Sequence, residues 1–194
     1  MLGDEALLSL SESPPYRVKG PRVSIIIPTF QEAKYLPNLL ISLKNQTYDP
    51  SCMEIIVADY NSTDGTREIA SKAGAIVLDV PRGISAGRNR GAAHATADIL
   101  IFFDADVILA PNLVERLVSA LVNSNLVCVC PGNYLYEGSL LDRASAALVA
   151  QFKPVWWTSG RCIAVKREAF NAIGGFDENI EPGEDRDFGV RLYR

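Results

Sequence analysis

Apolar residues in this chain gather, from residue 23 onward, in short continuous runs. Runs of this length, rich in isoleucine, valine and phenylalanine, are typical of strands that are buried on both faces of a sheet. The runs that predict strands lie at 23–28, 54–59, 75–80, 99–103 and, less distinctly, 126–130. Pro28 ends the first run, because proline has no N–H group to donate to a neighbouring strand.

The apolar spacing becomes helical between the predicted strands. Four leucines recur at i, i+3, i+4 and i+7, the spacing of one helix face: Leu36, Leu39, Leu40 and Leu43. Helices are also expected after the turn at 61–65, with Asp64 as a cap, and over 113–121, while a glycine-rich loop enters a helix at 83–95. Alternating strands and helices predict an α/β fold: a single Rossmann-like domain with a mostly parallel central sheet flanked by helices.

The composition fits one globular domain. A chain of 194 residues with 48% hydrophobic and 22% charged residues can bury one sizeable core and hardly two. The polar, proline-rich stretch at 11–22 indicates that residues 1–21 are an N-terminal lead-in and that residues 22–194 form the domain. A net charge of −4 argues against a nucleic-acid partner, because nucleic-acid binders usually present a basic face.

The cysteines and the lack of long apolar runs indicate the cellular compartment of the protein. The four cysteines, Cys52, Cys128, Cys130 and Cys162, include no pair with Cys-x-x-Cys spacing, so neither a zinc site nor a disulfide framework is expected. Cys128 and Cys130 alternate with valines, as core residues of a strand do. The N-terminus has no secretory signal, and no run of about 18 apolar residues occurs. A reducing, cytoplasmic location is expected, with peripheral membrane association only through further segments of a longer protein.

Two of the predicted strands end in aspartates. Asp104 and Asp106 follow the buried run 99–103, and Asp59 ends the run 54–59. The carboxyl ends of parallel strands meet at one edge of a sheet, where open α/β folds bind their ligands. Residues i and i+2 of an extended segment point the same way, so Asp104 and Asp106 can hold one divalent cation together with substrate phosphate oxygens. The alternative is a simple turn, which aspartate also favours.

A basic segment lies between these acids in the chain. Residues 82–91 include Arg82, Arg88 and Arg90 and no acidic residue. Glycines allow a ligand to approach the backbone closely, and a helix N-terminus with arginines favours a diphosphate. The alternative is a solvated, basic first turn of a helix.

A second acidic cluster lies near the C-terminus, at 183–188. It contains Glu184, Asp185 and Asp187, followed by the apolar residues of an amphipathic turn. Acids at a helix start offset the helix dipole, which is the structural interpretation. The functional interpretation is a carboxylate that takes a proton from an acceptor hydroxyl.

Six segments, in this order, resemble the motifs of the family 2 glycosyltransferases. They are Val-Ser-Ile-Ile-Ile-Pro-Thr-Phe-Gln-Glu (23–32), Ile-Val-Ala-Asp-Tyr-Asn-Ser-Thr-Asp-Gly-Thr (56–66), Gly-Ile-Ser-Ala-Gly-Arg-Asn-Arg-Gly (83–91), Phe-Phe-Asp-Ala-Asp (102–106), Gly-Gly-Phe-Asp-Glu (174–178) and Gly-Glu-Asp-Arg-Asp-Phe (183–188). The resemblance implies a catalytic domain of the GT-A fold. It also implies an inverting enzyme that uses a divalent cation, Mn²⁺ or Mg²⁺, to move a sugar from a nucleotide-diphosphate sugar to an acceptor hydroxyl.

The resemblance assigns roles to particular residues. The assignments are Pro28, Thr29 and Glu32 to the nucleoside pocket, Asp59 to the base, Arg88 to the approach to the nucleotide, Asp104 to the ribose and the metal, Asp106 to the divalent cation, and Asp185 to the general base. Phe30 and Gln31 replace the tyrosine and asparagine often found after this Pro-Thr, so the details of the base pocket stay open. Family frequency favours a UDP-sugar donor over a GDP-sugar, and the acceptor is a glycan, a lipid or another hydroxyl compound.

Other positions keep two interpretations. Trp156 and Trp157 lie in the region that meets sugar or acceptor in this family, but tryptophans also serve as core or interface residues. His94 is expected to be a surface or packing residue rather than a ligand. The family often supplies a further metal ligand beyond the Glu-Asp helix. Arg194 follows Asp185 by nine residues, so the chain either lacks that ligand or is the catalytic part of a longer protein.

Two other functions fit part of the pattern. A sugar-phosphate nucleotidyltransferase shares the fold type, but it would carry a glycine-rich loop and a basic residue where this chain has Pro-Thr-Phe-Gln-Glu (28–32). A non-catalytic module would bind a nucleotide-sugar at the same edge without turnover. The presence of Asp185 argues against such a module.

Overall fold

The computed structural model describes residue 14, residues 16–131 and residues 160–194. Its strands are β1 (Val23–Thr29), β2 (Met53–Asp59), β3 (Ile76–Asp79), β4 (Ile99–Phe103), β5 (Cys128–Val129) and β6 (Cys162–Lys166). Its helices are α2 (Leu36–Lys44), α3 (Thr66–Lys72), α4 (Ile84–His94), α5 (Leu113–Val122), α7 (Arg167–Ala172) and α8 (Glu184–Tyr193), with a 3₁₀ turn η1 (Pro50–Cys52). Each strand and helix expected from the apolar pattern has a counterpart among these elements.

The strands form one sheet in the order β3-β2-β1-β4-β6-β5. The first four strands of this order run parallel, whereas β6 pairs antiparallel with β4, and β5 pairs antiparallel with β6. The predicted α/β fold with a mostly parallel sheet is therefore confirmed. The antiparallel edge is a feature that the sequence pattern does not predict, because no strand was expected at Cys162–Lys166.

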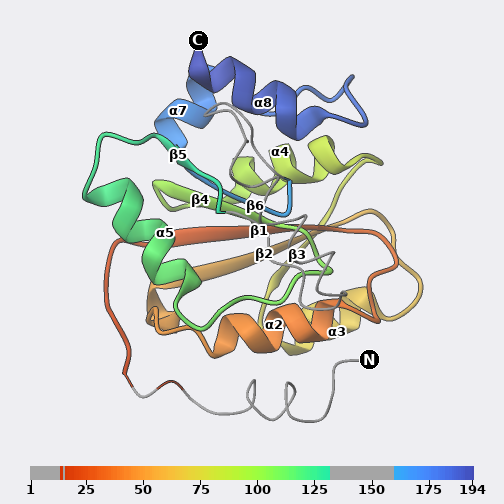
Figure 1. The fold of residues 1–194 in the computed structure, drawn as a ribbon. Helices are drawn as coiled ribbons and strands as arrows, with labels where there is room; N and C mark the ends of the chain where they lie inside the picture. The colour runs from red at the N-terminus through yellow and green to blue at the C-terminus, as the bar shows by residue number, and fades with distance from the viewer. Residues whose placement is uncertain (1–13, 15, 132–159) are drawn as a thin grey trace, which may run out of the picture.

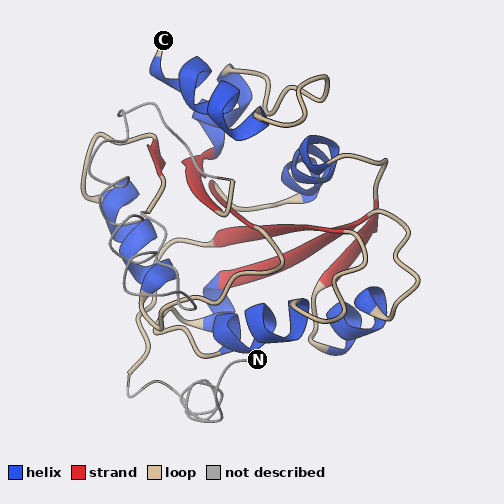
Figure 2. Cartoon of the chain, turned by 45° about the vertical axis from the view of Figure 1, so that its right-hand side comes forward, coloured by secondary structure: helices blue, strands red, loops and turns tan. Residues whose placement is uncertain are grey.

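Helices cover both faces of the sheet (Figures 1 and 2). α2, α3 and α5 lie on one face, and α4, α7 and α8 lie on the other. Side chains alternate along β4 between the two cores: Ile101 and Phe103 pack with residues of α2 and α5, while Phe102 packs with residues of α4, α7 and α8. All five residues of β4 are buried, which explains its unbroken apolar sequence. None of the described helices is long and apolar enough to cross a membrane.

The glycine-rich segment is more helical than expected. α4 takes up Ile84–His94, so Arg88 and Arg90 lie within the helix, and Arg82 stays in the loop before it. The strand-like run 126–130 shortens to the two residues of β5. α7, like β6, has no counterpart among the predicted elements.

Part of the predicted lead-in packs against the domain. The N–H of Val18 donates to Thr47 O (2.7 Å), and the N–H of Asp49 donates to Val18 O (2.9 Å). The hydroxyl of Tyr48 donates to Pro21 O (2.5 Å), and burial raises the pKa of Tyr48 to about 12. The backbone before β1 is thus anchored beside the segment that joins α2 to η1.

α4 lies close to the sheet because glycines face it. A Cβ atom at Gly91 would stand 2.3 Å from Cγ2 of Ile26, and one at Gly87 would stand 3.0 Å from Cβ of Pro28. Both distances are shorter than ordinary van der Waals contacts, so glycine allows a helix-to-sheet spacing that alanine would not. The close approach brings the side chain of Arg88 to the end of β4.

Gly91→Ala is expected to lower the free energy of unfolding by about 2 kcal/mol. This figure combines an overpacking cost of about 3 kcal/mol against the buried Ile26 with a gain of about 1 kcal/mol from alanine's higher helix propensity. Urea denaturation measures the change. Ala93→Gly, at an exposed position of α4, calibrates the propensity and should cost about 1 kcal/mol. A Gly91→Ala variant as stable as the parent would show that the close contact does not hold α4 in place.

Candidate active site at the carboxyl ends of the strands

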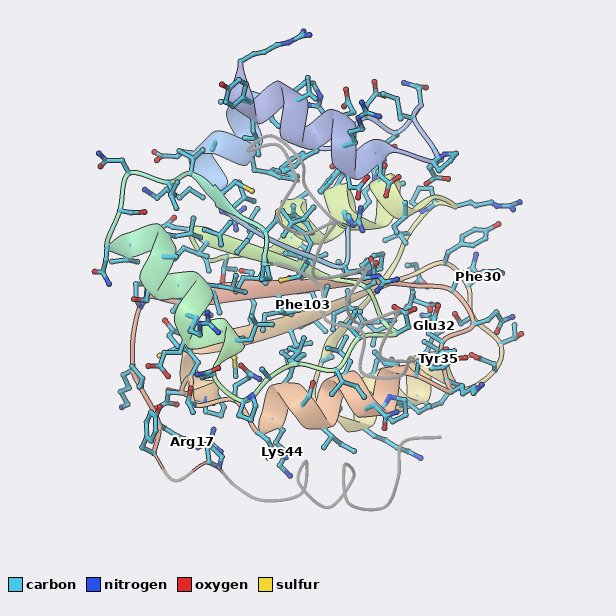
Figure 3. The ribbon with its side chains drawn as sticks, viewed as in Figure 1. Arg17, Phe30, Glu32, Tyr35, Lys44 and Phe103 are labelled. Atoms are coloured by element: carbon cyan, nitrogen blue, oxygen red, sulfur yellow. The ribbon has the colours of Figure 1, made fainter. Side chains whose placement is uncertain are left out.

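The carboxyl ends of β1, β2 and β4 meet at one edge of the sheet, as predicted. Thr29 ends β1 beside Asp59, which ends β2. β4 is the parallel neighbour of β1 on its other side and leads directly into Asp104 and Asp106. Figure 3 shows Glu32 in the segment beyond the end of β1. The predicted aspartates therefore share one edge of the sheet.

The carboxylates at this edge perturb one another. The pKa of Glu32 is raised by burial and then by the negative charges of Asp106, Asp64 and Asp104. Burial also raises the pKa of Asp104, although the guanidinium of Arg88 acts in the opposite direction. Carboxylates whose ionised forms are disfavoured in this way provide a site that a cation would stabilise.

The carboxylate pair Asp104 and Asp106 has the chemistry of a partial cation site. Carboxylate oxygens are the ligands that Mg²⁺ and Mn²⁺ prefer. Among the described residues, no group of three or more histidine, cysteine or acidic side chains could hold a metal ion by itself. The pair therefore fits a cation that takes its other ligands from a diphosphate and water, as Mg²⁺ commonly does at nucleotide sites.

Asp59 is fully buried, and both of its carboxylate oxygens accept hydrogen bonds. Oδ1 accepts from the hydroxyls of Thr29 (2.8 Å) and Ser62 (2.6 Å). Oδ2 accepts from the N–H of Ser62 (2.9 Å) and from Nη1 of Arg67 (3.3 Å). Asp59 thus fixes the turn after β2 against β1, and its contact with a base stays a prediction.

Asp64 ties the same turn to the loop after β1. Its Oδ1 accepts from the N–H (3.0 Å) and hydroxyl (2.6 Å) of Thr66, and its Oδ2 accepts from the N–H of Ala33 (3.0 Å). Gly65, with a φ of 99°, occupies the N-cap position of α3. Asp64 therefore bonds the first helical amide, as a capping side chain would, from one position earlier in the chain.

Phe30 and Gln31, the two departures from the family pattern, line this edge. The ring of Phe30 is exposed and contacts that of Tyr60, with centroids 5.3 Å apart. The N–H of Gln31 donates to Oγ of Ser62 (2.9 Å), and its side-chain Nε2 donates to Oγ1 of Thr63 (3.1 Å). The loops after β1 and β2 are thus joined by an aromatic contact as well as by polar ones.

Asp59→Asn is expected to weaken the binding of UMP or GMP roughly tenfold, equally with and without Mn²⁺, because its proposed partner is the base and not the cation. Calorimetric titration under both conditions measures the effect. Asp79→Asn is the matched control, since Asp79 pairs with the same Arg67 from an exposed position. A loss of affinity confined to Mn²⁺-containing buffer would contradict the assignment.

Arg88 lies at the same edge, but its side chain is fully buried. Its Nη2 donates to Asp104 Oδ1 (2.9 Å) and Gly160 O (3.0 Å), and its Nη1 donates to Glu184 Oε1 (3.1 Å). The guanidinium also lies over the ring of Phe176, 5.1 Å from the centroid. Both Nη atoms thus face protein groups in this structure, and the approach of Arg88 to the nucleotide stays a prediction.

The three acids in the first turn of α8 have different surroundings. Glu184 is buried and engaged by Arg88. Asp185 is half-buried, and its Oδ2 accepts from the N–H of Gly160 (2.8 Å). Asp187 forms an i,i+4 ion pair with Arg191 along α8, with 2.6 Å between Oδ2 of Asp187 and Nε of Arg191. Of the three acids, Asp185 is the one that hydrogen bonds to the segment held by Arg88.

The N-terminus of α4 is bonded to a protein carboxylate. The N–H of Ile84 donates to Oε1 of Glu181 (2.6 Å). The sequence predicts a diphosphate at this helix start, but in this structure the carboxylate of Glu181 accepts the hydrogen bond from the N–H of Ile84. Arg82 and Arg90 are exposed. The basic segment is thus divided between a buried ion pair at Arg88 and solvated side chains on either side.

The remaining candidates lie apart from the carboxylates or outside the described part of the chain. His94 is exposed at the last position of α4, as expected. Trp156 and Trp157 lie outside the described residues. Cys128 and Cys130 are half-buried next to β6, with their Sγ atoms 4.0 Å apart, and the described cysteines are free thiols.

Comparisons with known proteins point to one family. The model of glycosyl transferase family 2 matches residues 24–176. Succinoglycan biosynthesis protein ExoA of Rhizobium meliloti (strain 1021) is 30% identical over 190 residues, which cover 87% of this chain and 57% of that protein. A mannosyltransferase from Pyrobaculum calidifontis, solved with GDP-Man and Mn²⁺, has a TM-score of 0.72 and 25% identity, covering 97% of this chain and 57% of that one.

A second solved structure has the same fold. Glucosyl-3-phosphoglycerate synthase from Mycobacterium tuberculosis, in complex with Mn²⁺, UDP-glucose and phosphoglyceric acid, has a TM-score of 0.56 and 26% identity, covering 78% of this chain and 58% of that one. The chain spans about half the length of the curated relatives it matches. Because the family model covers most of the chain and the sheet is that of GT-A glycosyltransferases, the chain belongs to glycosyl transferase family 2.

Proposed function

We propose that this chain moves a sugar from a nucleotide-diphosphate sugar to an acceptor hydroxyl, with inversion at the anomeric carbon and with the help of a divalent cation. One observation carries the proposal. Gly160 bonds both Arg88 and Asp185, and Arg88 bonds Asp104. The proposed base and the proposed cation ligand thus belong to one contiguous network at the ligand-binding edge of the sheet.

The nucleoside half of the site lies at the ends of β1 and β2. Pro28, Thr29 and Glu32 line the nucleoside pocket, and Asp59 recognises the base. Asp59 fixes Thr29 and Ser62 beside this pocket, and a contact with the base would replace one of the hydrogen bonds that its carboxylate accepts from the protein. The surface beside it is aromatic and polar, as a nucleobase pocket requires.

The diphosphate half of the site lies beyond β4. Asp104 and Asp106 hold the cation, which when bound would offset the negative charge that develops on the leaving nucleoside diphosphate. The raised pKa values of Glu32 and Asp104 support a cation here, because neighbouring carboxylates repel one another and a cation between them would relieve that repulsion. Mn²⁺ accompanies the donor in both solved relatives described above.

Asp185 is the proposed general base. Its carboxylate would accept the proton of the acceptor hydroxyl as the oxygen attacks the anomeric carbon from the side opposite the leaving group. Its hydrogen bond from the N–H of Gly160, whose carbonyl accepts from Arg88, supports this role. A base on the acceptor side, separate from the cation ligands, is the arrangement that an inverting transfer needs.

The donor is proposed to be a UDP-sugar, with a GDP-sugar as the other candidate. The solved relatives contain GDP-Man in one case and UDP-glucose in the other. The acceptor belongs to the broad class of glycans, lipids and other hydroxyl compounds.

Calorimetric titration with UDP-glucose, UDP-GlcNAc and GDP-mannose, each with Mn²⁺ and with EDTA, tests the proposal. Binding of one donor in Mn²⁺, followed by release of UDP or GDP, is expected. Absence of binding to all three would overturn the donor site. Binding without release, even with glycan and alcohol acceptors, would favour a non-catalytic module. Release of pyrophosphate from a nucleoside triphosphate and a sugar phosphate would indicate nucleotidyl transfer instead.

A further inference from the structure

The guanidinium of Arg88 joins three segments that are far apart in the chain. It contacts Asp104, 16 positions away, Gly160, 72 positions away, and Glu184, 96 positions away. Its side chain is fully buried, and that of Glu184 is 12% exposed. A buried ion pair of this kind has little freedom, because breaking it leaves uncompensated charge away from water.

Two paths lead from Arg88 to Asp185. The first runs through Gly160, whose carbonyl accepts from Arg88 (3.0 Å) and whose N–H donates to Asp185 Oδ2 (2.8 Å). The second runs through Glu184, the neighbour of Asp185 in the first turn of α8. Glu184 Oε1 accepts from Arg88 (3.1 Å), and its Oε2 accepts from the N–H of Gly183 (3.1 Å). Both paths end at the same carboxylate.

The geometry leaves little room for rearrangement. A Cβ atom at Gly160 would stand 2.8 Å from Nη2 of Arg88, so a side chain there would displace the guanidinium. Gly183 has a φ of 109°, a conformation that favours glycine, and it turns the chain into α8 at Glu184. The N–H of Asp104 also donates to Arg161 O (3.4 Å), which ties the end of β4 to the segment that follows Gly160.

We infer that Arg88 and Glu184 are positioning residues, which hold Asp185 at a set place relative to Asp104. This inference rests on the proposed function, in which Asp185 is the base. Among the described residues, Glu184 reaches the donor side through Arg88 and through the effect of its charge on Asp104, whereas it directly precedes Asp185 in the chain. Its main effect is therefore expected on proton transfer rather than on donor binding. A base displaced by about 1 Å commonly costs a large factor in rate.

Glu184→Gln tests the inference, because glutamine keeps the size of the side chain but loses the charge that pairs with Arg88. Its amide group also cannot accept from both Arg88 and the N–H of Gly183. Turnover is measured as release of UDP or GDP from radiolabelled UDP-glucose or GDP-mannose in Mn²⁺, with water as acceptor. The variant should lose roughly 10–100-fold in kcat while its donor Kd, measured by calorimetry, stays within about twofold of the parent value.

A double-mutant cycle separates positioning from general damage. If Glu184 acts through Asp185, then Glu184→Gln in an Asp185→Asn background lowers kcat by less than about threefold. A merely structural fault would multiply the two losses. Asp187→Asn is the control, since Asp187 lies in the same turn but pairs with Arg191. It should change neither kcat nor donor Kd.

The amide resonance of Gly160, observed after glycine-selective ¹⁵N labelling, gives a readout that needs no turnover. It should shift in Glu184→Gln and in Asp185→Asn and stay in place in Asp187→Asn. An unshifted resonance in Glu184→Gln, or multiplicative losses in the cycle, would overturn the positioning role. If the parent protein releases no UDP or GDP with water or with the glycan and alcohol acceptors, the proposed function fails, and the Gly160 resonance alone decides whether the bridge positions Asp185.

Discussion

Asp106→Ala should abolish the cation-dependent part of UDP and GDP binding while leaving the fold intact. Asp106 is exposed and follows the buried end of β4, so its carboxylate can face a ligand without supporting the core. Its charge raises the pKa values of Glu32 and Asp104, which means that its removal relieves repulsion in the folded protein. The variant is therefore expected to be at least as stable as the parent.

Calorimetric titration of UDP and GDP, with Mn²⁺ and with EDTA, measures the effect. The parent should bind more tightly in Mn²⁺, and the variant should bind equally weakly under both conditions. Asp98→Ala is the matched control, because Asp98 is an exposed acid directly before the amino end of β4, whereas Asp106 follows its carboxyl end. A parent protein that binds as well in EDTA as in Mn²⁺ would contradict the metal assignment.

The strands that carry the site could be predicted because their continuous apolar sequences are typical of buried strands. Ile99–Phe103 is apolar at every position, and the structure buries each side chain. The order of strands and helices then places the carboxyl ends of β1, β2 and β4 at one edge, as α/β topology requires. Asp59, Asp104 and Asp106 follow from this arrangement without any long-range information.

Arg88 shows what the sequence could not predict. Three arginines in a glycine-rich segment indicate an anion site, but the anions that bind Arg88 are the chain's own carboxylates, Asp104 and Glu184. Glu184 is 96 positions away, and no local pattern shows that the two side chains meet. Gly160 was missed for a further reason: its contribution is made by backbone groups, which any residue type carries.

The helix start at Ile84 likewise has a partner that the local sequence does not predict. A basic loop that enters a helix favours a diphosphate, but Glu181, 97 positions away, bonds the amide of Ile84. β6 is an example of a strand that depends on a segment far away in the chain. Its five residues become a strand through antiparallel pairing with β4, from which they are separated by more than fifty positions. Such pairings depend on the tertiary fold and not on local propensity.

Asp185→Asn should reduce turnover by roughly 10²–10⁴-fold while leaving donor affinity nearly unchanged. Asparagine keeps the size of the side chain and an oxygen that can accept from the N–H of Gly160, so the segment around it should stay in place. What asparagine loses is basicity. A base removes its proton during transfer and not when the donor binds, which is why kcat and Kd should separate.

Release of UDP or GDP, measured beside calorimetric donor binding, tests this separation, and the rival acids of the same turn supply the comparison. Glu184→Gln should lose less activity than Asp185→Asn, because Glu184 affects the reaction by positioning Asp185 and does not itself take the proton. Asp187→Asn should lose none, since its carboxylate is held by Arg191 along α8. On a helix, residues two apart point to different sides, so Asp185 and Asp187 cannot both face one acceptor. If Asp185→Asn turned over normally while Asp187→Asn did not, the base would have to be reassigned to Asp187.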